Sequence, residues 1–166
     1  MSTILPNPTG AGYFNAISYG GTTISIEVNS GVSGPLPFGT VVQIEPYTGP
    51  GTTNPPTVAT CQPSSTTADQ YILGVIVGGQ TDNLVDGNAV APGRVAQVQV
   101  VGIAQVLCDA TTTAGYPLVQ SAATAGAAKC TTSGAAPTNG EGIGVALQAV
   151  TISSGTALVW ALLKNQ

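Results

Sequence analysis

The feature that most constrains the fold is a period of two along Val95–Cys108, in which one set of alternate positions is apolar throughout. The even-numbered positions are all apolar or glycine, whereas the odd-numbered positions include Gln97, Gln99 and Gln105. A period of two places successive side chains on opposite faces of an extended chain, so this stretch predicts one long strand with one buried face. Gly102 interrupts the apolar face and predicts a bulge or a bend there.

Shorter stretches of the same character follow one another along the chain, with Gly and Pro between them. No window carries the apolar stripe of an amphipathic helix, while Val, Ile and Thr, which favour strands, recur throughout. The further strands are expected at residues 23–28, 40–45, 71–77, 118–120, 128–131, 143–152 and 156–163, the last two joined by a turn at residues 153–155. This spacing predicts an all-β fold, a β-sandwich or β-barrel of jelly-roll or Greek-key type.

Two regions lack strand patterning. Residues 1–20 show no periodicity and predict an extended N-terminal arm in front of a single β domain at residues 21–166. Residues 47–70 are rich in Pro, Gly, Thr and Ser and predict a long loop within that domain. Trp160 and Phe38 stand alone in the sequence, which favours core or interface anchors over a ligand-stacking site.

The composition favours a protein that associates. Apolar residues make up 43% of the 166 residues, and only 6% are charged, where a soluble domain commonly has about a quarter. A surface of Thr, Ser, Asn and Gln is cheaper to desolvate than a charged one and lacks the charge repulsion that keeps molecules apart. The only bases, Arg94, Lys129 and Lys164, are far apart in sequence, so no direct contact with nucleic acid is expected.

No targeting or membrane segment is expected. The N-terminal residues lack the basic region and apolar run of a signal peptide, and no stretch reaches the roughly 20 apolar residues of a membrane span. We therefore expect synthesis in the cytoplasm and no membrane partner.

The residues of catalysis are largely missing. The chain has no His, which removes the most frequent general base and the Ser–His triads. Asp82 and Asp86 lie in a Gly/Asn-rich turn whose spacing matches no standard calcium loop, and such residues ordinarily bond their own backbone. The expectation is a protein that is not an enzyme, with no catalytic residue, no metal and no cofactor.

The three cysteines do not form a zinc motif. Cys61, Cys108 and Cys130 have no CxxC spacing and no His to join them. Buried free thiols are the expectation, and a Cys108–Cys130 disulfide stays open.

From Tyr71 onward the order of the motifs resembles the capsid decoration, or cement, proteins of tailed bacteriophages. The segments that carry the resemblance are packing motifs, and nothing before Tyr71 adds to it. They are Ile72-Leu73-Gly74-Val75, the stretch at residues 100–106, Gly115-Tyr116-Pro117-Leu118-Val119 (where the family often has an acid in place of Tyr116), the small residues 122–129, the IGVAL strand at residues 143–147 and the apolar terminal strand.

The resemblance implies a structural module on the outer surface of the virion. It would bind the major capsid protein, stabilise the shell and act as a homotrimer at local three-fold positions. Four large apolar residues of the arm, Ile4, Leu5, Tyr13 and Phe14, are the candidates for contact with a neighbouring subunit or the capsid. The alternative is a receptor- or glycan-binding module of a head fibre or tail, for which a cluster of exposed aromatic residues and acids would be expected.

Overall fold

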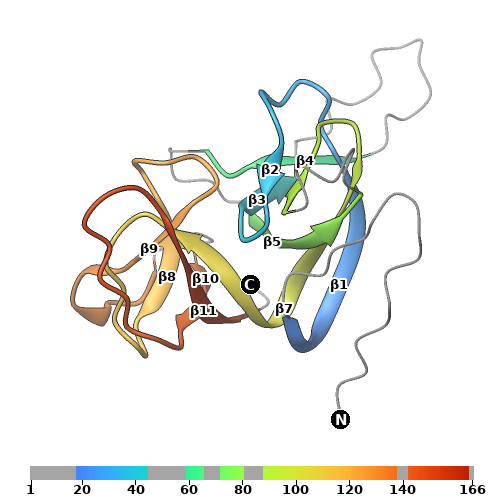
Figure 1. The fold of residues 1–166 in the computed structure, drawn as a ribbon. Helices are drawn as coiled ribbons and strands as arrows, with labels where there is room; N and C mark the ends of the chain where they lie inside the picture. Colours follow the sequence, from blue (N-terminus) through green and yellow to red (C-terminus); the bar gives the residue numbers. More distant parts are fainter. Residues whose placement is uncertain (1–17, 45–58, 66–71, 81–87, 138–141, 165–166) are drawn as a thin grey trace.

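The computed structural model describes residues 18–44, 59–65, 72–80, 88–137 and 142–164. The predicted all-β fold is confirmed, because this part of the chain is built from strands, and its one helical element is the short 3₁₀ turn Thr132–Gly134. Figure 1 shows the strands in two groups, one on each side of the long strand β7. The strands are β1 (Ser18–Val28), β2 (Leu36–Pro37), β3 (Val41–Ile44), β4 (Thr60–Pro63), β5 (Ile72–Gly79), β6 (Ala89–Val90), β7 (Val95–Cys108), β8 (Pro117–Gln120), β9 (Ala128–Cys130), β10 (Gly142–Ala146) and β11 (Ala157–Leu163).

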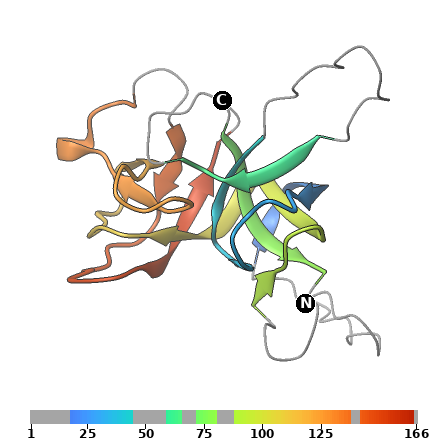
Figure 2. The same cartoon turned by 90° about the horizontal axis from the view of Figure 1, so that it is seen from above.

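The strand pairings close two rings that share β7. The first ring runs β1-β4-β3-β5-β7 and returns to β1, and we call it barrel 1. The second runs β7-β11-β10-β8-β9 and returns to β7, and we call it barrel 2. Each ring has one parallel pair, β1 with β4 and β7 with β9, because a closed ring of five strands cannot be antiparallel throughout. Figure 2 shows the same two groups side by side, with the orange and red strands of barrel 2 at the left and the blue and green strands of barrel 1 at the right.

Both barrels have the same topology and the same pairing register. In chain order the strands of barrel 1 are β1, β3, β4, β5 and β7, and those of barrel 2 are β7, β8, β9, β10 and β11. In both barrels the first strand pairs with the third and the fifth, the second pairs with the third and the fourth, and the fourth pairs with the fifth. The Cα partners in barrel 1 are Glu27↔Val95, Val28↔Cys61, Val42↔Pro63, Val42↔Gly74 and Val75↔Gln99. At the corresponding places in barrel 2 they are Leu107↔Leu158, Cys108↔Ala128, Leu118↔Cys130, Leu118↔Gly144 and Val145↔Leu162.

The correspondence extends to the loops. The amide of Gly39 donates to the carbonyl of Ile76 at 2.8 Å, and the amide of Gly115 donates to that of Ala146 at 2.8 Å. Both glycines have a positive φ, 92° and 84°, a conformation that L-residues with a side chain rarely adopt. The β2–β6 pairing of barrel 1 has its counterpart in the isolated bridge Thr112↔Val150 of barrel 2. We conclude that the fold is an internal duplication in which β7 is the last strand of one copy and the first strand of the next.

β7 serves both barrels because it bends at Gly102, as its sequence predicts. Gly102 has a φ of 113°, and a Cβ there would overlap the carbonyl oxygen of Gly20 on β1. The buried amide of Gln99 lies at the same bend, where its Nε2 donates to the carbonyls of Gly20 at 3.0 Å and Val101 at 3.1 Å. The side chain thus satisfies backbone groups that the bend removes from the ladder.

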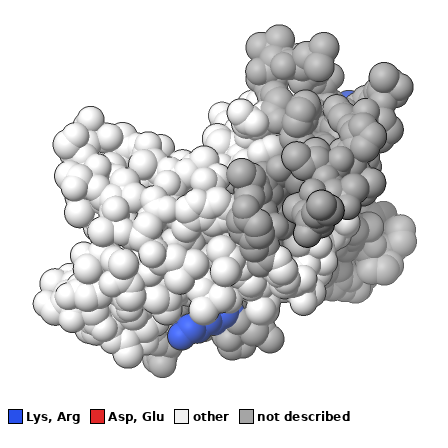
Figure 3. Space-filling model, turned by 60° about the horizontal axis from the view of Figure 1, so that its bottom comes forward, with Lys and Arg blue, Asp and Glu red and all other residues white. Residues whose placement is uncertain are grey.

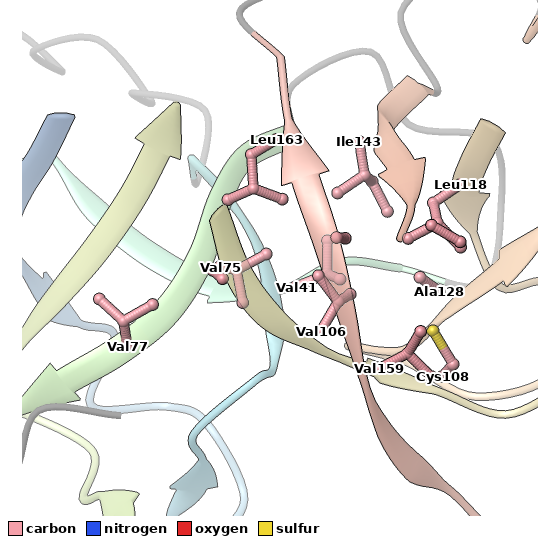
Figure 4. Close-up of a cluster of buried hydrophobic side chains, with 13 residues drawn as sticks. Val41, Val75, Val77, Val106, Cys108, Leu118, Ala128, Ile143, Val159 and Leu163 are labelled. Atoms are coloured by element: carbon pink, nitrogen blue, oxygen red, sulfur yellow. The ribbon is translucent and has the colours of Figure 1, made fainter. Parts of the chain in front are cut away.

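Two clusters of buried apolar side chains fill the fold. The barrel 1 cluster includes Phe38, Ile76 and Val98, so Phe38, expected as a core or interface anchor, lies in the core. The cluster shown in Figure 4 fills barrel 2 with Val106, Val159, Leu163 and other residues, and it extends onto Val41, Val75 and Val77 of β3 and β5. β3 and β5 therefore bury both faces, one inside barrel 1 and the other against barrel 2.

The sequence prediction fails at several places within the described residues. The loop expected at residues 47–70 contains β4, a four-residue strand whose Cys61 is fully buried in barrel 1. The strand expected at residues 143–152 ends at Ala146, because the following residues pair with a loop of barrel 2 instead: the amide of Thr112 donates to the carbonyl of Val150 at 2.9 Å. β1 begins at Ser18, so residues 18–20, expected to end the N-terminal arm, belong to a strand that was expected only from residue 23. The strand predicted at Val95–Cys108 has the predicted bounds.

Candidate interaction surface

The residues proposed from the sequence as interface anchors, Ile4, Leu5, Tyr13 and Phe14, lie outside the described residues. The same holds for the turn that contains Asp82 and Asp86. The structure therefore places none of these residues, and the surface has to be derived from the two barrels.

The ionisable groups of the barrels do not assemble into a reactive site. Among the described residues the side-chain carboxyl groups are those of Glu27 and Asp109, and no group of three or more possible metal ligands occurs. Asp109 is engaged locally, since it accepts a hydrogen bond from the hydroxyl of Ser121. That hydroxyl in turn accepts from the amides of Ala123 at 2.9 Å and Thr124 at 3.3 Å, so the carboxylate organises the turn between β8 and β9.

The thiols are free and packed into the barrels. Cys61 and Cys108 are buried, and Cys130 is half-buried. Burial raises the pKa of Cys61 to about 11 and is the main cause that raises the pKa of Cys108 to about 12, to which the neighbouring Cys130 and Asp109 contribute. A thiol with so high a pKa is a weak nucleophile at neutral pH, and these side chains act as small apolar core residues.

An exposed apolar face lies on the outside of barrel 2. Leu158 and Leu162 on β11 are 42% and 39% exposed, and Leu147, just after β10, is 45% exposed. Large apolar side chains at this exposure are unremarkable singly, but a contiguous group of them commonly marks an interaction site.

Strand pairing brings these residues together. Leu162 lies opposite Val145 on β10 and opposite Ile103 on β7, and side chains of directly paired residues share one face of a sheet. Leu158 lies opposite Leu107, and the amide of Leu147 donates to the carbonyl of Trp160 at 2.8 Å. We call this group the β10–β11 face; its members are Ile103, Leu107, Val145, Leu147, Leu158, Trp160 and Leu162.

Charge is scarce around these barrels. Only Glu27, Arg94, Asp109, Lys129 and Lys164 carry ionisable charged side chains among the described residues. Figure 3 shows one whole side of the molecule on which the described residues present little Lys or Arg and no visible Asp or Glu. A half-buried Trp160 within an uncharged apolar face has the composition of a protein–protein interface core, where aromatic residues are enriched and charges depleted.

No family model matches the chain, and no curated protein matches it. Within the described residues, no helix has the length and apolar character needed to cross a membrane.

The sequence predicts Trp160 as a core or interface anchor but does not predict the face around it. The apolar run at residues 156–163 gave no indication of which side chains point outward, because both sides of this strand are apolar. The signal that could have found the face is the comparison of the two halves of the chain: Leu73-Gly74-Val75 of β5 corresponds to Ile143-Gly144-Val145 of β10.

Proposed function

We propose that this protein is a non-enzymatic structural protein that decorates the outside of a tailed-bacteriophage capsid and stabilises the shell as a homotrimer. The observation that carries the proposal is the combination of a charge-poor β module and an exposed apolar face with Trp160 at its centre. A shell protein present in many copies needs broad, partly polar contacts, and symmetric attachment multiplies weak individual contacts into firm binding.

The resemblance of the segments from Tyr71 onward to decoration proteins supports the same function. These segments contain all five strands of barrel 2, including β7, which barrel 1 shares, and they also contain β5 of barrel 1. Gly74 and Gly144, which occur in two of the motifs, hold the strands in close contact, because a Cβ at either position would overlap a carbonyl oxygen of the neighbouring strand. The shared motifs are therefore packing motifs that maintain the strand arrangement. The proposed binding to the capsid depends on the surface of this module.

Co-sedimentation with phage heads that lack decoration protein tests the proposal. The purified protein should pellet with the heads up to a fixed number of copies per head and should raise the temperature at which the heads release their DNA. A protein that stays in the supernatant at every concentration contradicts the proposal, and binding to cell-surface glycans instead would establish the receptor-binding alternative.

The proposed contact of the N-terminal arm has its own test. We expect that deletion of residues 1–15, which contain Ile4, Leu5, Tyr13 and Phe14, abolishes head binding or trimer formation. Head binding and subunit mass that both remain at wild-type values would show that the arm makes no such contact. The deletion removes no residue of the described barrels, because β1 begins at Ser18.

A further inference from the structure

The duplication assigns a partner to the β10–β11 face. In barrel 1 the outer face of the second and fourth strands carries Val41, Val75 and Val77, whose exposed fractions are 0%, 0% and 3%. These side chains are buried because they belong to the apolar cluster that fills barrel 2. On barrel 1, this face is therefore covered by the next barrel of the same chain.

Barrel 2 has the same face without that cover. The pairing register places Pro117 and Val145 where barrel 1 has Val41 and Val75, since Val41↔Val75 and Pro117↔Val145 are equivalent pairs. Leu147 corresponds to Val77, because each lies two residues after the equivalent valines Val145 and Val75. Pro117 and Val145 are only half-buried, and Leu147 is 45% exposed where Val77 is 3% exposed. The sequence has kept an apolar residue at each of the three positions although no later barrel follows within the described chain.

We infer that the β10–β11 face is an interface that binds a second copy of this chain. The surface that covers the equivalent face of barrel 1 belongs to a barrel of the same fold, and a second copy is the partner that supplies such a barrel. The remainder of the face is apolar, with Leu158 and Leu162 exposed and Gln105 as its polar neighbour, so an uncharged partner surface suits it.

The geometry favours contact between different surfaces of the two copies. Only barrel 2 presents this face uncovered. A contact between two copies that resembles the contact between the two barrels of one chain therefore joins barrel 2 of one copy to a different surface of the next copy. Contacts of this head-to-tail type produce closed rings when the rotation between neighbours closes, and a trimer is the smallest such ring above a dimer. The inference thus names the surface through which the homotrimer of the proposed function assembles, and it rests on that function only for the number of copies.

Light scattering on purified variants tests the interface. The wild-type protein should have the mass of an oligomer of the 16.4 kDa chain, and Leu147→Lys and Leu162→Lys should each reduce that mass to that of a single chain. The matched control is Val95→Lys, which introduces the same charge at a 39% exposed position on the corresponding strand of barrel 1 and should keep the wild-type mass. Thermal melts that match the wild type establish that the variants are folded.

Three results would overturn the inference: a wild-type protein of single-chain mass, two leucine variants of unchanged mass, or loss of association in Val95→Lys as well. Head binding measured on the same samples separates the two proposals. An oligomer that ignores heads refutes the decoration function and leaves the interface, whereas a monomer whose head binding is lost in Leu147→Lys shows that the face binds the capsid instead of a second copy.

Discussion

Gly144→Ala should destabilise the protein far more than an alanine substitution at an exposed glycine. Gly144 lies on β10 where β11 approaches closely, and a Cβ there would overlap the carbonyl oxygen of Leu162 and come within 3.0 Å of the Cα of Leu163. Backbone atoms cannot rotate away, so the two strands must separate. Overpacking of a well-packed site costs about 1–3 kcal/mol, and we expect about 3 kcal/mol because main-chain atoms are displaced. For a chain of this length that lowers the melting temperature by about 6–12 °C.

The control is Gly155→Ala, at a position with a φ of 69° and open space around the missing Cβ. Its cost is the left-handed conformation alone, about 1 kcal/mol. Differential scanning calorimetry and urea unfolding measure both variants. The duplication adds a second expectation: Gly74→Ala, whose Cβ would overlap the carbonyl oxygen of Gln99 at the corresponding place in barrel 1, should cost the same as Gly144→Ala within about 1 kcal/mol. If Gly144→Ala costs no more than Gly155→Ala, the close packing of β10 on β11 is wrong.

Three further predictions concern the interior. Gln99→Leu should cost about 1–3 kcal/mol of unfolding free energy, because it removes the amide that donates to the carbonyls of Gly20 and Val101, although it also removes the buried Oε1, which has no hydrogen-bond partner among the described residues. An unchanged urea midpoint would show that the bend of β7 does not need this amide. The contribution of Cys61 and Cys108 to stability should be constant below about pH 9 and should be lost as the pH rises toward 11–12, because the unfolded thiols ionise near 9.0 whereas the folded ones stay protonated. Cys61→Ala/Cys108→Ala removes this part of the fall, and an identical pH profile for that variant would exclude the thiols as its source. Leu163→Ala should cost about 2–5 kcal/mol and keep a single unfolding transition, because Leu163 shares a cluster with Val75 of barrel 1; two separate transitions would mean that the barrels unfold independently.

The sequence was most informative where a strand has one buried and one exposed side. The alternation in Val95–Cys108 predicted a strand with the correct bounds, and Gly102 predicted its bend. β4 was missed because its four residues, Thr60–Pro63, lie in a stretch of Thr, Ser and Pro, and only their register against β3 and β1 makes them a strand.

The double-barrel arrangement could not be read from the sequence for a related reason. The two halves share their pairing register but few identical residues, since a barrel interior requires apolar side chains of suitable volume and accepts many combinations. Leu73-Gly74-Val75 and Ile143-Gly144-Val145 are the clearest trace, and the glycine persists because only it fits against the neighbouring carbonyl. The exposed face of barrel 2 follows from the difference in exposure between the equivalent residues Leu147 and Val77. That equivalence depends on the strand pairing, which the sequence alone does not provide.

The most direct test of the central claim is electron cryo-microscopy of undecorated phage heads after incubation with this protein. We expect additional density on the outside of the shell, at symmetric positions and with a size that fits groups of three copies. Heads whose outer surface stays bare at saturating protein, or density confined to the tail, would contradict it.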